Sequence, residues 1–240
     1  MSRNVLSLYT RRLIRASFDW AFPRLCYVCD RPLTADEDII CLDCNLEMPR
    51  TALHLSQFNT IHQRVAGNAT IDTAAGWFYY YTDSPYARLI KTAKYNDRPM
   101  LARRLGQLYA QELAADGLAG KFDVYLPVPL FFTKKIRRGY NQSREIAIGM
   151  ADILGGDVGD NLVARRSHHS QTSRGALNRF LNVRGTYSLK CPEELDGLRV
   201  AIVDDIVTTG STLLDCVNAI ALTANPASIN ILTLGVTRMR

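Results

Sequence analysis

The chain has 240 residues, 22% of which are charged, and a formal net charge of +6 at pH 7. This length is enough for one full domain with a buried core and one smaller module. The ordinary composition is typical of a soluble globular protein, and the absence of any apolar run of membrane-spanning length excludes a transmembrane segment. We expect a cytoplasmic protein, because the first 20 residues lack the uninterrupted apolar stretch and the cleavage site of a secretory signal.

The first segment, residues 1–24, is predicted to form an N-terminal helix. Apolar residues recur along one side of it, and three arginines lie nearby. Docking of this helix on the protein's own surface is the preferred interpretation, and a helix on a membrane surface is the alternative.

Residues 25–50 contain four of the six cysteines, arranged as two pairs with two residues between the members of each pair. The pairs are Cys26 with Cys29 and Cys41 with Cys44. This spacing predicts a tetrahedral zinc site, whereas two disulfides are the alternative that a cytosolic location disfavours. Since sulfur would fill all four positions, the zinc ion is expected to be structural rather than catalytic.

A polar connector follows over residues 51–82 and ends in AAGWFYYYTD, which predicts a strand. Two histidines of this connector, His54 and His62, are expected at the surface rather than in a second metal site.

From residue 83 to the end, predicted helices and strands alternate. Strands are expected at residues 123–130, 198–205 and 228–236, and helices on both sides of residues 97–99, at 143–154 and from Ser211 onward. This alternation predicts an α/β fold with a doubly wound parallel sheet over residues 83–240. Ligands of such sheets bind beyond the carboxyl ends of the strands.

The positive charge is concentrated in the middle of the chain. Residues 88–144 hold 12 Lys and Arg against 4 Asp and Glu, whereas the remaining residues carry a net charge of −2. A basic segment of this kind suits phosphate groups or nucleic acid, and a solvated surface without a partner is the alternative.

The stretch VAIVDDIVTTGSTL, residues 200–213, combines a buried strand, two acidic residues, a hydroxyl-rich turn and the start of a helix. The neighbouring carboxylates of Asp204 and Asp205 can accept hydrogen bonds from two vicinal ribose hydroxyls. The turn offers backbone N–H groups and the positive end of a helix dipole to a phosphate. It consists of Thr208, Thr209, Gly210, Ser211 and Thr212. A ribose with a 5′-phosphate satisfies the whole stretch, and an ordinary strand–turn–helix with a charged cap is the alternative.

The same stretch resembles the phosphoribosyl pyrophosphate (PRPP) signature of type I phosphoribosyltransferases. The chain also carries a cysteine module followed by LIKTAKYND, LPVPL, RRGYNQS and SQTSRGALNRFLNVRGTY. This arrangement is similar to the competence protein F (ComF/GntX) family, and the resemblance extends from about Phe22 to the C-terminus. It implies a type I phosphoribosyltransferase-like fold, in which Asp204 and Asp205 hold the ribose hydroxyls of PRPP and residues 208–212 hold its 5′-phosphate.

The basic stretch LPVPLFFTKKIRRGYNQS is expected to face the same edge of the sheet as Asp204. Pyrophosphate needs cations and backbone N–H groups, and Mg²⁺ usually bridges it to the sugar. The candidates for binding pyrophosphate are Lys134, Lys135, Arg137, Arg138 and Gly139. The candidates for contacting an acceptor or ordering the loop are Tyr140, Asn141 and Gln142. A basic surface loop is the alternative, and Lys91, Lys94 and Tyr95 either approach the phosphates or form a helix surface.

A long polar segment, RRSHHSQTSRGALNRFLNVRGTY, separates a strand predicted at NLVARR from the signature strand. Segments of this kind are often lids or acceptor-binding hoods. Gln171, Arg179 and Asn182 match the family's pattern in it, whereas His168 and His169 are expected to be solvent-exposed.

Two functions from different classes follow. The first is a phosphoribosyltransferase that uses PRPP and Mg²⁺, with an acceptor and catalytic residues that the sequence does not identify and with a role in DNA uptake. Glutamine-driven amination by this chain alone is not expected, because it begins Met1-Ser2 rather than with the N-terminal cysteine of a glutaminase domain.

The second is a non-catalytic competence protein that binds single-stranded DNA or partners a helicase. The basic segment would hold the DNA backbone, and the aromatic residues interleaved with it would stack bases. These aromatics, which a core would accommodate equally well, are Tyr95, Tyr109, Phe131, Phe132 and Tyr140. In a third interpretation, the zinc module is the docking face for a DNA-translocating helicase.

Overall fold

The computed structural model describes residues 23–67, 69–95, 98–130, 138–164 and 186–238. In this part of the chain, no helix is both long enough and apolar enough to cross a membrane. The predicted N-terminal helix over residues 1–24 lies almost entirely outside the described residues. So does the segment that carries Gln171, Arg179 and Asn182, together with His168 and His169.

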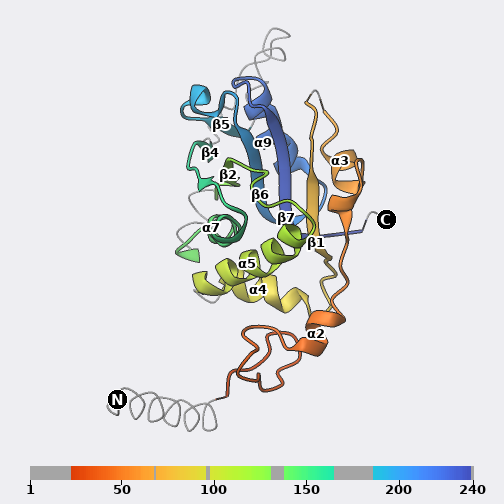
Figure 1. The fold of residues 1–240 in the computed structure, drawn as a ribbon. Coiled ribbons are helices and arrows are strands. Elements are labelled where there is room, and N and C mark those ends of the chain that lie inside the picture. The colour runs from red at the N-terminus through yellow and green to blue at the C-terminus, as the bar shows by residue number, and fades with distance from the viewer. Residues whose placement is uncertain (1–22, 68, 96–97, 131–137, 165–185, 239–240) are drawn as a thin grey trace, which may run out of the picture.

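A five-stranded sheet forms the centre of the molecule (Figure 1). Its strands lie in the order β1-β7-β6-β2-β3, and each neighbouring pair is parallel. The strands are β1 (Ala74–Tyr79), β2 (Val124–Pro127), β3 (Asp157–Val158), β6 (Arg199–Val207) and β7 (Ser228–Val236). Because all five strands run the same way, their carboxyl ends meet at one edge of the sheet.

Helices cover both faces of this sheet, which confirms the predicted doubly wound α/β fold. One face carries α4 (Ala87–Tyr95), α5 (Pro99–Ala115) and α7 (Gln142–Leu154), and the other carries α3 (Thr60–Arg64) and α9 (Ser211–Ala221). Alternate residues of β6 serve the two faces: Ala201 and Val203 join the core under α5 and α7, whereas Val200 and Ile202 join the core under α9. A strand buried on both sides explains why its sequence is a continuous apolar run rather than an alternating one.

Two glycines bring α5 and α7 into backbone contact. A Cβ atom at Gly149 would lie 2.0 Å from the carbonyl oxygen of Arg103, and one at Gly106 would lie 2.3 Å from that of Ile146. Only glycine fits at such distances, so the two helices cross closely and α7 is held firmly in place. The first turn of α7 thereby reaches the carboxyl end of β6.

A separate two-stranded sheet pairs β4 (Leu162–Ala164) with β5 (Tyr187–Leu189) in antiparallel register. The strand predicted at NLVARR therefore exists, but it lies outside the main sheet. Its pairing, with Ala164 opposite Tyr187, brings the residues on either side of the predicted hood segment together.

The cysteine module contains the short helix α2 (Leu42–Leu46) and lies beside α4 and α5, at the lower end of Figure 1. Buried apolar side chains of the module belong to the same core as those of α4, α5 and β1. Three ion pairs reinforce the contact: Arg88 with Asp30, Arg104 with Asp38, and Arg50 with Glu112. One hydrophobic core thus continues from the module into the α/β sheet, and β1, which comes from the predicted connector, is an edge strand of that sheet. The division of the chain into four domains or segments stays a prediction.

The prediction that His54 and His62 lie at the surface is wrong for His62, which is buried, whereas His54 is half-buried. His62 is 6% exposed, because its Nδ1 accepts a hydrogen bond from the Asn59 backbone N–H at 3.1 Å in the capping box that starts α3. His54 lies within a short 3₁₀ turn (Leu53–Leu55) and is held by Asp116, directly after α5, with 2.7 Å between its Nε2 and the carboxylate oxygen. A local capping bond thus orients His62, whereas a bond to a residue 62 positions away in the sequence orients His54.

Candidate functional site

The two carboxylates of the signature lie near the end of β6, at the carboxyl edge of the sheet. Asp204 is aligned with Thr233 of β7. Its Oδ1 accepts two hydrogen bonds, one from the Ser143 hydroxyl at 3.0 Å and one from the Asp205 backbone N–H at 2.9 Å. Ser143 is in the first turn of α7, so a helix from a distant part of the sequence orients this carboxyl group.

Asp205 is 6% exposed and is held by two other elements. The Lys94 ammonium at the end of α4 lies 3.1 Å from its Oδ1, and Gln142 Nε2 donates to its Oδ2 at 2.8 Å. Of the two lysines considered on α4, Lys94 thus reaches the site, whereas Lys91 bonds to the carbonyl oxygen of Thr82 at 2.8 Å. Gln142, a candidate for acceptor contact or loop ordering, orders a site carboxylate in this structure.

The carboxyl groups of Asp204 and Asp205 repel each other when both are ionised. Burial of its carboxyl group, followed by the negative charge of Asp205, raises the pKa of Asp204 to about 7. The hydrogen bonds from Asp205 N–H and Ser143, together with the Lys94 charge, act in the opposite direction but are outweighed. The pKa of Asp204 thus lies close to neutral pH, well above the usual range for an aspartate.

The hydroxyl-rich turn lies directly after β6 and leads into α9. Thr208, Thr209, Ser211 and Thr212 are exposed, and the Thr209 and Ser211 hydroxyl oxygens are 3.1 Å apart. Gly210 provides no side-chain cap at the N-terminus of α9, and the Ser211 N–H donates to the Thr209 hydroxyl in a long hydrogen bond of 3.4 Å. A small pocket lined by Asp204 and residues 206–213 opens there.

Gly210 is required at this turn for two independent reasons. Its φ is +85°, and a Cβ atom on it would lie 2.7 Å from the Cβ of Arg64 and 2.9 Å from the Arg64 carbonyl oxygen. Arg64, at the end of α3, also donates to the carbonyl oxygen of Val207 at 3.2 Å and to that of Thr237. Arg64 therefore supports the turn on the side of α3. No motif in the sequence indicates this role for Arg64.

The pyrophosphate candidates are only partly described. Lys134, Lys135 and Arg137 lie outside the described residues. Arg138 and Gly139 come shortly before α7, and Gly139 has a φ of +75° in an exposed turn. That turn precedes the helix whose first residues hold both carboxylates, so these two residues are close in sequence to the site.

Tyr140 and Asn141 connect this turn to the rest of the protein. The Tyr140 hydroxyl donates to the carbonyl oxygen of Ala93 on α4. The Asn141 side chain accepts from the Ser143 N–H at 3.1 Å, which caps α7, and donates to the carbonyl oxygen of Val128 at 3.0 Å. Both residues therefore order the loop, and contact with an acceptor stays a prediction.

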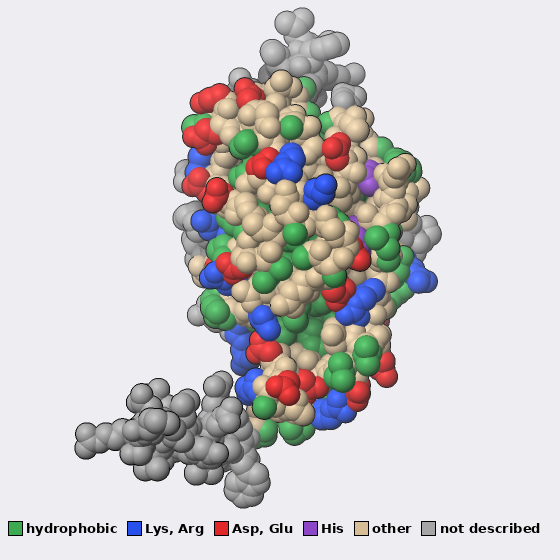
Figure 2. Space-filling model, in the orientation of Figure 1, with side chains coloured by type: hydrophobic (Ala, Val, Ile, Leu, Met, Phe, Trp, Pro, Cys, Tyr) green, Lys and Arg blue, Asp and Glu red, His purple; other side chains and the backbone are tan. Residues whose placement is uncertain are grey.

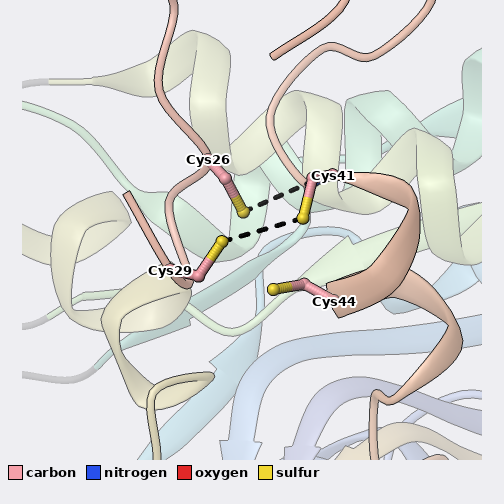
Figure 3. Close-up of side chains that lie close together, drawn as sticks. All are labelled: Cys26, Cys29, Cys41 and Cys44. Carbon is pink, nitrogen blue, oxygen red and sulfur yellow. Dashed lines mark hydrogen bonds between the residues drawn. The ribbon is translucent and has the colours of Figure 1, made fainter. Parts of the chain in front are cut away.

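The four patterned cysteines converge on one point (Figure 3). Their sulfur atoms all lie within 4.8 Å of one another, and those of Cys29 and Cys41 are 3.7 Å apart. Sulfurs around one tetrahedral zinc ion are roughly 3.8 Å apart, given a zinc–sulfur bond of about 2.3 Å. The Cys26 sulfur accepts backbone N–H groups of Val28 and Cys41 at 3.4 Å, as expected for a thiolate ligand. The cluster fits a metal ion such as zinc, with no open coordination position.

The Phosphoribosyl transferase domain family model matches residues 102–235. The match covers more than half of the chain and includes the acidic pair and the turn, so the chain belongs to the phosphoribosyl transferase domain family. The resemblance to the competence protein F family is confirmed by its relatives.

Two relatives show this. The DNA utilization protein YhgH of Salmonella typhimurium (strain LT2) is 28% identical over 202 residues, which are 80% of this chain and 88% of that protein. Competence protein F of Haemophilus influenzae is 38% identical over 95 residues, which are 38% of this chain and 41% of that protein. A solved structure of the allosteric regulatory enzyme of purine biosynthesis has a TM-score of 0.41 and 23% identity, over 55% of this chain and 25% of that one.

Proposed function

We propose that the protein binds PRPP together with Mg²⁺ and transfers the phosphoribosyl group to an acceptor. The observation that carries this proposal is the acidic pair of β6 followed at once by the uncapped N-terminus of α9. Ribose hydroxyls would donate hydrogen bonds to Asp204 and Asp205, and the 5′-phosphate would accept hydrogen bonds from the backbone N–H groups of the turn.

The contacts around the carboxylates support a site that rearranges when ligand binds. Lys94 and Gln142 hold Asp205, and a ribose hydroxyl would share or replace one of these bonds. Among the described residues, Gln142 Oε1 is buried without a hydrogen-bond partner, so a sugar hydroxyl that reached it after this rearrangement would satisfy it. A released Lys94 ammonium would be free to approach the pyrophosphate.

The proposed chemistry is nucleophilic substitution at C1′ of the ribose. The transition state has oxocarbenium character, so carboxylates beside the ribose and cations beside the leaving pyrophosphate both stabilise it. Mg²⁺ supplies charge neutralisation for the pyrophosphate when it binds with PRPP, and the carboxylate oxygens of Asp204 and Asp205 are of the type that this cation prefers. Lys134, Lys135, Arg137, Arg138 and Gly139 remain the candidates for contacting pyrophosphate.

Calorimetric titration with PRPP, with and without Mg²⁺, tests the proposal. Micromolar binding that needs Mg²⁺ and is lost in Asp204→Asn/Asp205→Asn is the expected result. Asp160→Asn is the matched control, since Asp160 is exposed and pairs with Lys190 rather than with a residue that holds Asp204 or Asp205. Absence of PRPP binding to the native chain would contradict the proposal.

The second candidate is a non-catalytic competence protein that binds single-stranded DNA or a helicase. The names of the relatives, "Competence protein F" and "DNA utilization protein", favour a DNA-related role, and a cytoplasmic location is proposed with it. A basic surface for DNA has less support: Arg88, Arg103 and Arg104 pair with carboxylates, and acidic and basic side chains are interspersed on the face in Figure 2.

The aromatic residues proposed to stack bases also have less support from the structure. Tyr109 is 1% exposed and stacks on Trp77 inside the core, so it is not available to a base. Tyr140 is bonded to α4, and Phe131 and Phe132 lie outside the described residues. DNA affinity that falls steeply with salt, without any dependence on PRPP or Mg²⁺, would favour this second candidate.

Helicase docking on the cysteine module has one supporting observation. Leu42 and Leu46 are 59% and 73% exposed and lie one turn apart on α2. Loss of helicase binding in Leu42→Ser/Leu46→Ser, with the fold retained, is the expected result. Deletion of residues 1–50 is a poorer test, because it would open the core that the module shares with the sheet.

A further inference from the structure

A cavity of about 450 Å³ lies where the cysteine module meets the first turns of α5. Tyr27, Asp38 and Ile39 line it from the module, and residues of the segment 98–107 line it from α5. A cavity of this size is large enough for a small organic molecule. Its lining includes none of the four clustered cysteines and neither carboxylate of the acidic pair, so it is separate from both sites described above.

The deeper part of the cavity is apolar. Ile39 is 8% exposed and Leu101 is 4% exposed, and both belong to the core that the module shares with α5. Met100 also lines the cavity, and its side chain is 69% exposed. A flat ring lying on Met100 would remove apolar surface from water, and a thioether makes favourable contacts with aromatic rings. The cavity therefore suits a ligand with an aromatic portion.

Charged side chains line the same cavity, namely Arg98, Arg103, Arg104 and Asp38. Arg104 pairs with Asp38, and Arg103 pairs with Asp152 of α7 at 3.0 Å. Gln107 links the two pairs, because it accepts a hydrogen bond from Arg104 at 3.0 Å and donates one to Asp152 at 2.9 Å. This network orders two guanidinium groups in advance, which lowers the entropic cost of binding a ligand.

Both paired arginines retain hydrogen-bond donors. Arg103 uses Nε and Nη2 toward Asp152, whereas Arg104 uses Nε toward Asp38 and Nη1 toward Gln107. A guanidinium group has five N–H donors, so each arginine keeps a terminal nitrogen for which no described residue is an acceptor. An oxyanion in the cavity could accept hydrogen bonds from these nitrogens without breaking the ion pairs.

Arg98 supplies a charge that no carboxylate balances. Its side chain is exposed, its guanidinium carbon lies 5.6 Å from the centre of the Tyr27 ring, and it donates a hydrogen bond to the Tyr27 hydroxyl. Among the described residues it forms no ion pair. Three arginines against Asp38 and Asp152 leave a net charge of +1 at the cavity, which attracts an anion.

We propose that this cavity binds a small aromatic phosphate, about the size of a mononucleotide. The ring lies on Met100 above the apolar residues, and the phosphate oxygens accept hydrogen bonds from Arg98 and from the remaining terminal nitrogens of Arg103 and Arg104. A phosphate has three free oxygens for these three donor groups, whereas a carboxylate has two. The site goes beyond the proposed function and does not depend on it. Because its two walls belong to the module and to α5, an occupied cavity would stabilise their contact.

The test uses 1-naphthyl phosphate as the probe, since it has a ring and a phosphate but no ribose for the acidic pair to bind. The full chain, with ¹³C-labelled methionine methyl groups, is titrated in excess ribose 5-phosphate and followed by NMR. We expect the Met100 signal, assigned with Met100→Leu, to shift through the ring current of the probe. The signals of Met48 and Met150, which are 4% and 0% exposed, are internal references.

Two charge variants test the contribution of Arg98. Arg98→Gln should weaken binding of the probe roughly ten-fold, because a charge-assisted hydrogen bond is lost. Lys121→Gln is the matched control: Lys121 is exposed and lies beyond the other end of α5, which is about 25 Å long. It removes the same charge and should leave the affinity unchanged.

Four outcomes would overturn the inference. The first is a Met100 signal that does not move when the probe is added. The second is equal weakening by Arg98→Gln and Lys121→Gln, which would indicate non-specific attraction of anions. The third is inorganic phosphate binding as tightly as the probe, since the ring would then contribute nothing. The fourth is an Arg98→Gln variant that weakens a single-stranded oligonucleotide but not the probe, in which case the surface serves a DNA strand.

Discussion

The cysteine module and the carboxyl edge of the sheet both gather groups that repel one another when ionised, but they resolve the repulsion differently. Four sulfurs within 4.8 Å surround a point where one metal ion satisfies all of them. The carboxyl group of Asp205 instead contacts Lys94 and Gln142, and that of Asp204 accepts a hydrogen bond from Ser143. These contacts do not cancel the repulsion, because the pKa of Asp204 is still raised to about 7.

This difference separates a structural site from one suited to a ligand. A closed tetrahedral cluster has no position left for a substrate, so a metal ion bound there would act on folding. The acidic site combines three unsatisfied features. Its two carboxyl groups repel each other, Gln142 Oε1 is a buried acceptor without a partner among the described residues, and the N-terminus of α9 has no side-chain cap. Groups left in this state are stabilised further only when something binds to them.

The largest effect is expected from loss of a zinc ligand. Cys29→Ala should lower zinc content and destabilise the protein by several kcal/mol, because the module shares its core with α4 and α5. Cys29 is exposed, so the change acts through the metal rather than through packing. Zinc content and thermal unfolding measure the outcome, with Cys191→Ala as the control outside the cluster. A Cys29→Ala protein with unchanged stability would break the comparison between the two sites.

A smaller effect is expected at the hydroxyl-rich turn between β6 and α9. Gly210→Ala should destabilise the protein by about 3 kcal/mol, since it combines a left-handed residue with a clash against Arg64. Gly197→Ala is the matched control: its φ is +73°, but no atom lies within 4 Å of the added Cβ. It should cost only about 1 kcal/mol, the backbone contribution alone. Urea denaturation measures both, and equal losses would show that Arg64 does not brace the turn.

The smallest of the three effects is a pH dependence from Asp204. Its native pKa of about 7 lies above the ordinary value near 3.9, so between these values the native state binds more protons than the unfolded state. Stability should therefore fall as pH rises, by about 2 kcal/mol from about pH 5 to about pH 7.

Asp204→Asn should remove this slope, whereas Asp160→Asn should keep it, because Lys190 lowers the pKa of Asp160 out of that range. Urea denaturation at several pH values measures the slope. A native protein whose stability is flat across this range would mean that the two carboxylates are not in conflict.

Features that depend on neighbours in sequence could be predicted. β7 spans Ser228–Val236, and α9 begins at Ser211, as the apolar pattern indicated. The cysteine cluster and the strand–turn–helix at residues 200–213 are contiguous motifs, in which short spacing already brings the reactive groups together. Periodicity and spacing act over a few residues, so a single sequence displays them directly.

Features that depend on distant segments could not be predicted. Gln142 reaches Asp205 across 63 residues, and Arg64 reaches Val207 across 143. His62 was wrongly expected at the surface for a related reason, since its burial depends on what packs over it.

The sequence by itself determined the α/β class, the clustered cysteines and the acidic pair beside a hydroxyl-rich turn, because each is encoded by residues close together in the chain. Only the tertiary structure decided which side chains hold the acidic pair and that Arg64 lies against the turn. A parallel sheet brings the carboxyl ends of separate strands to one edge, and the order of its strands, rather than the order of residues, selects the neighbours there.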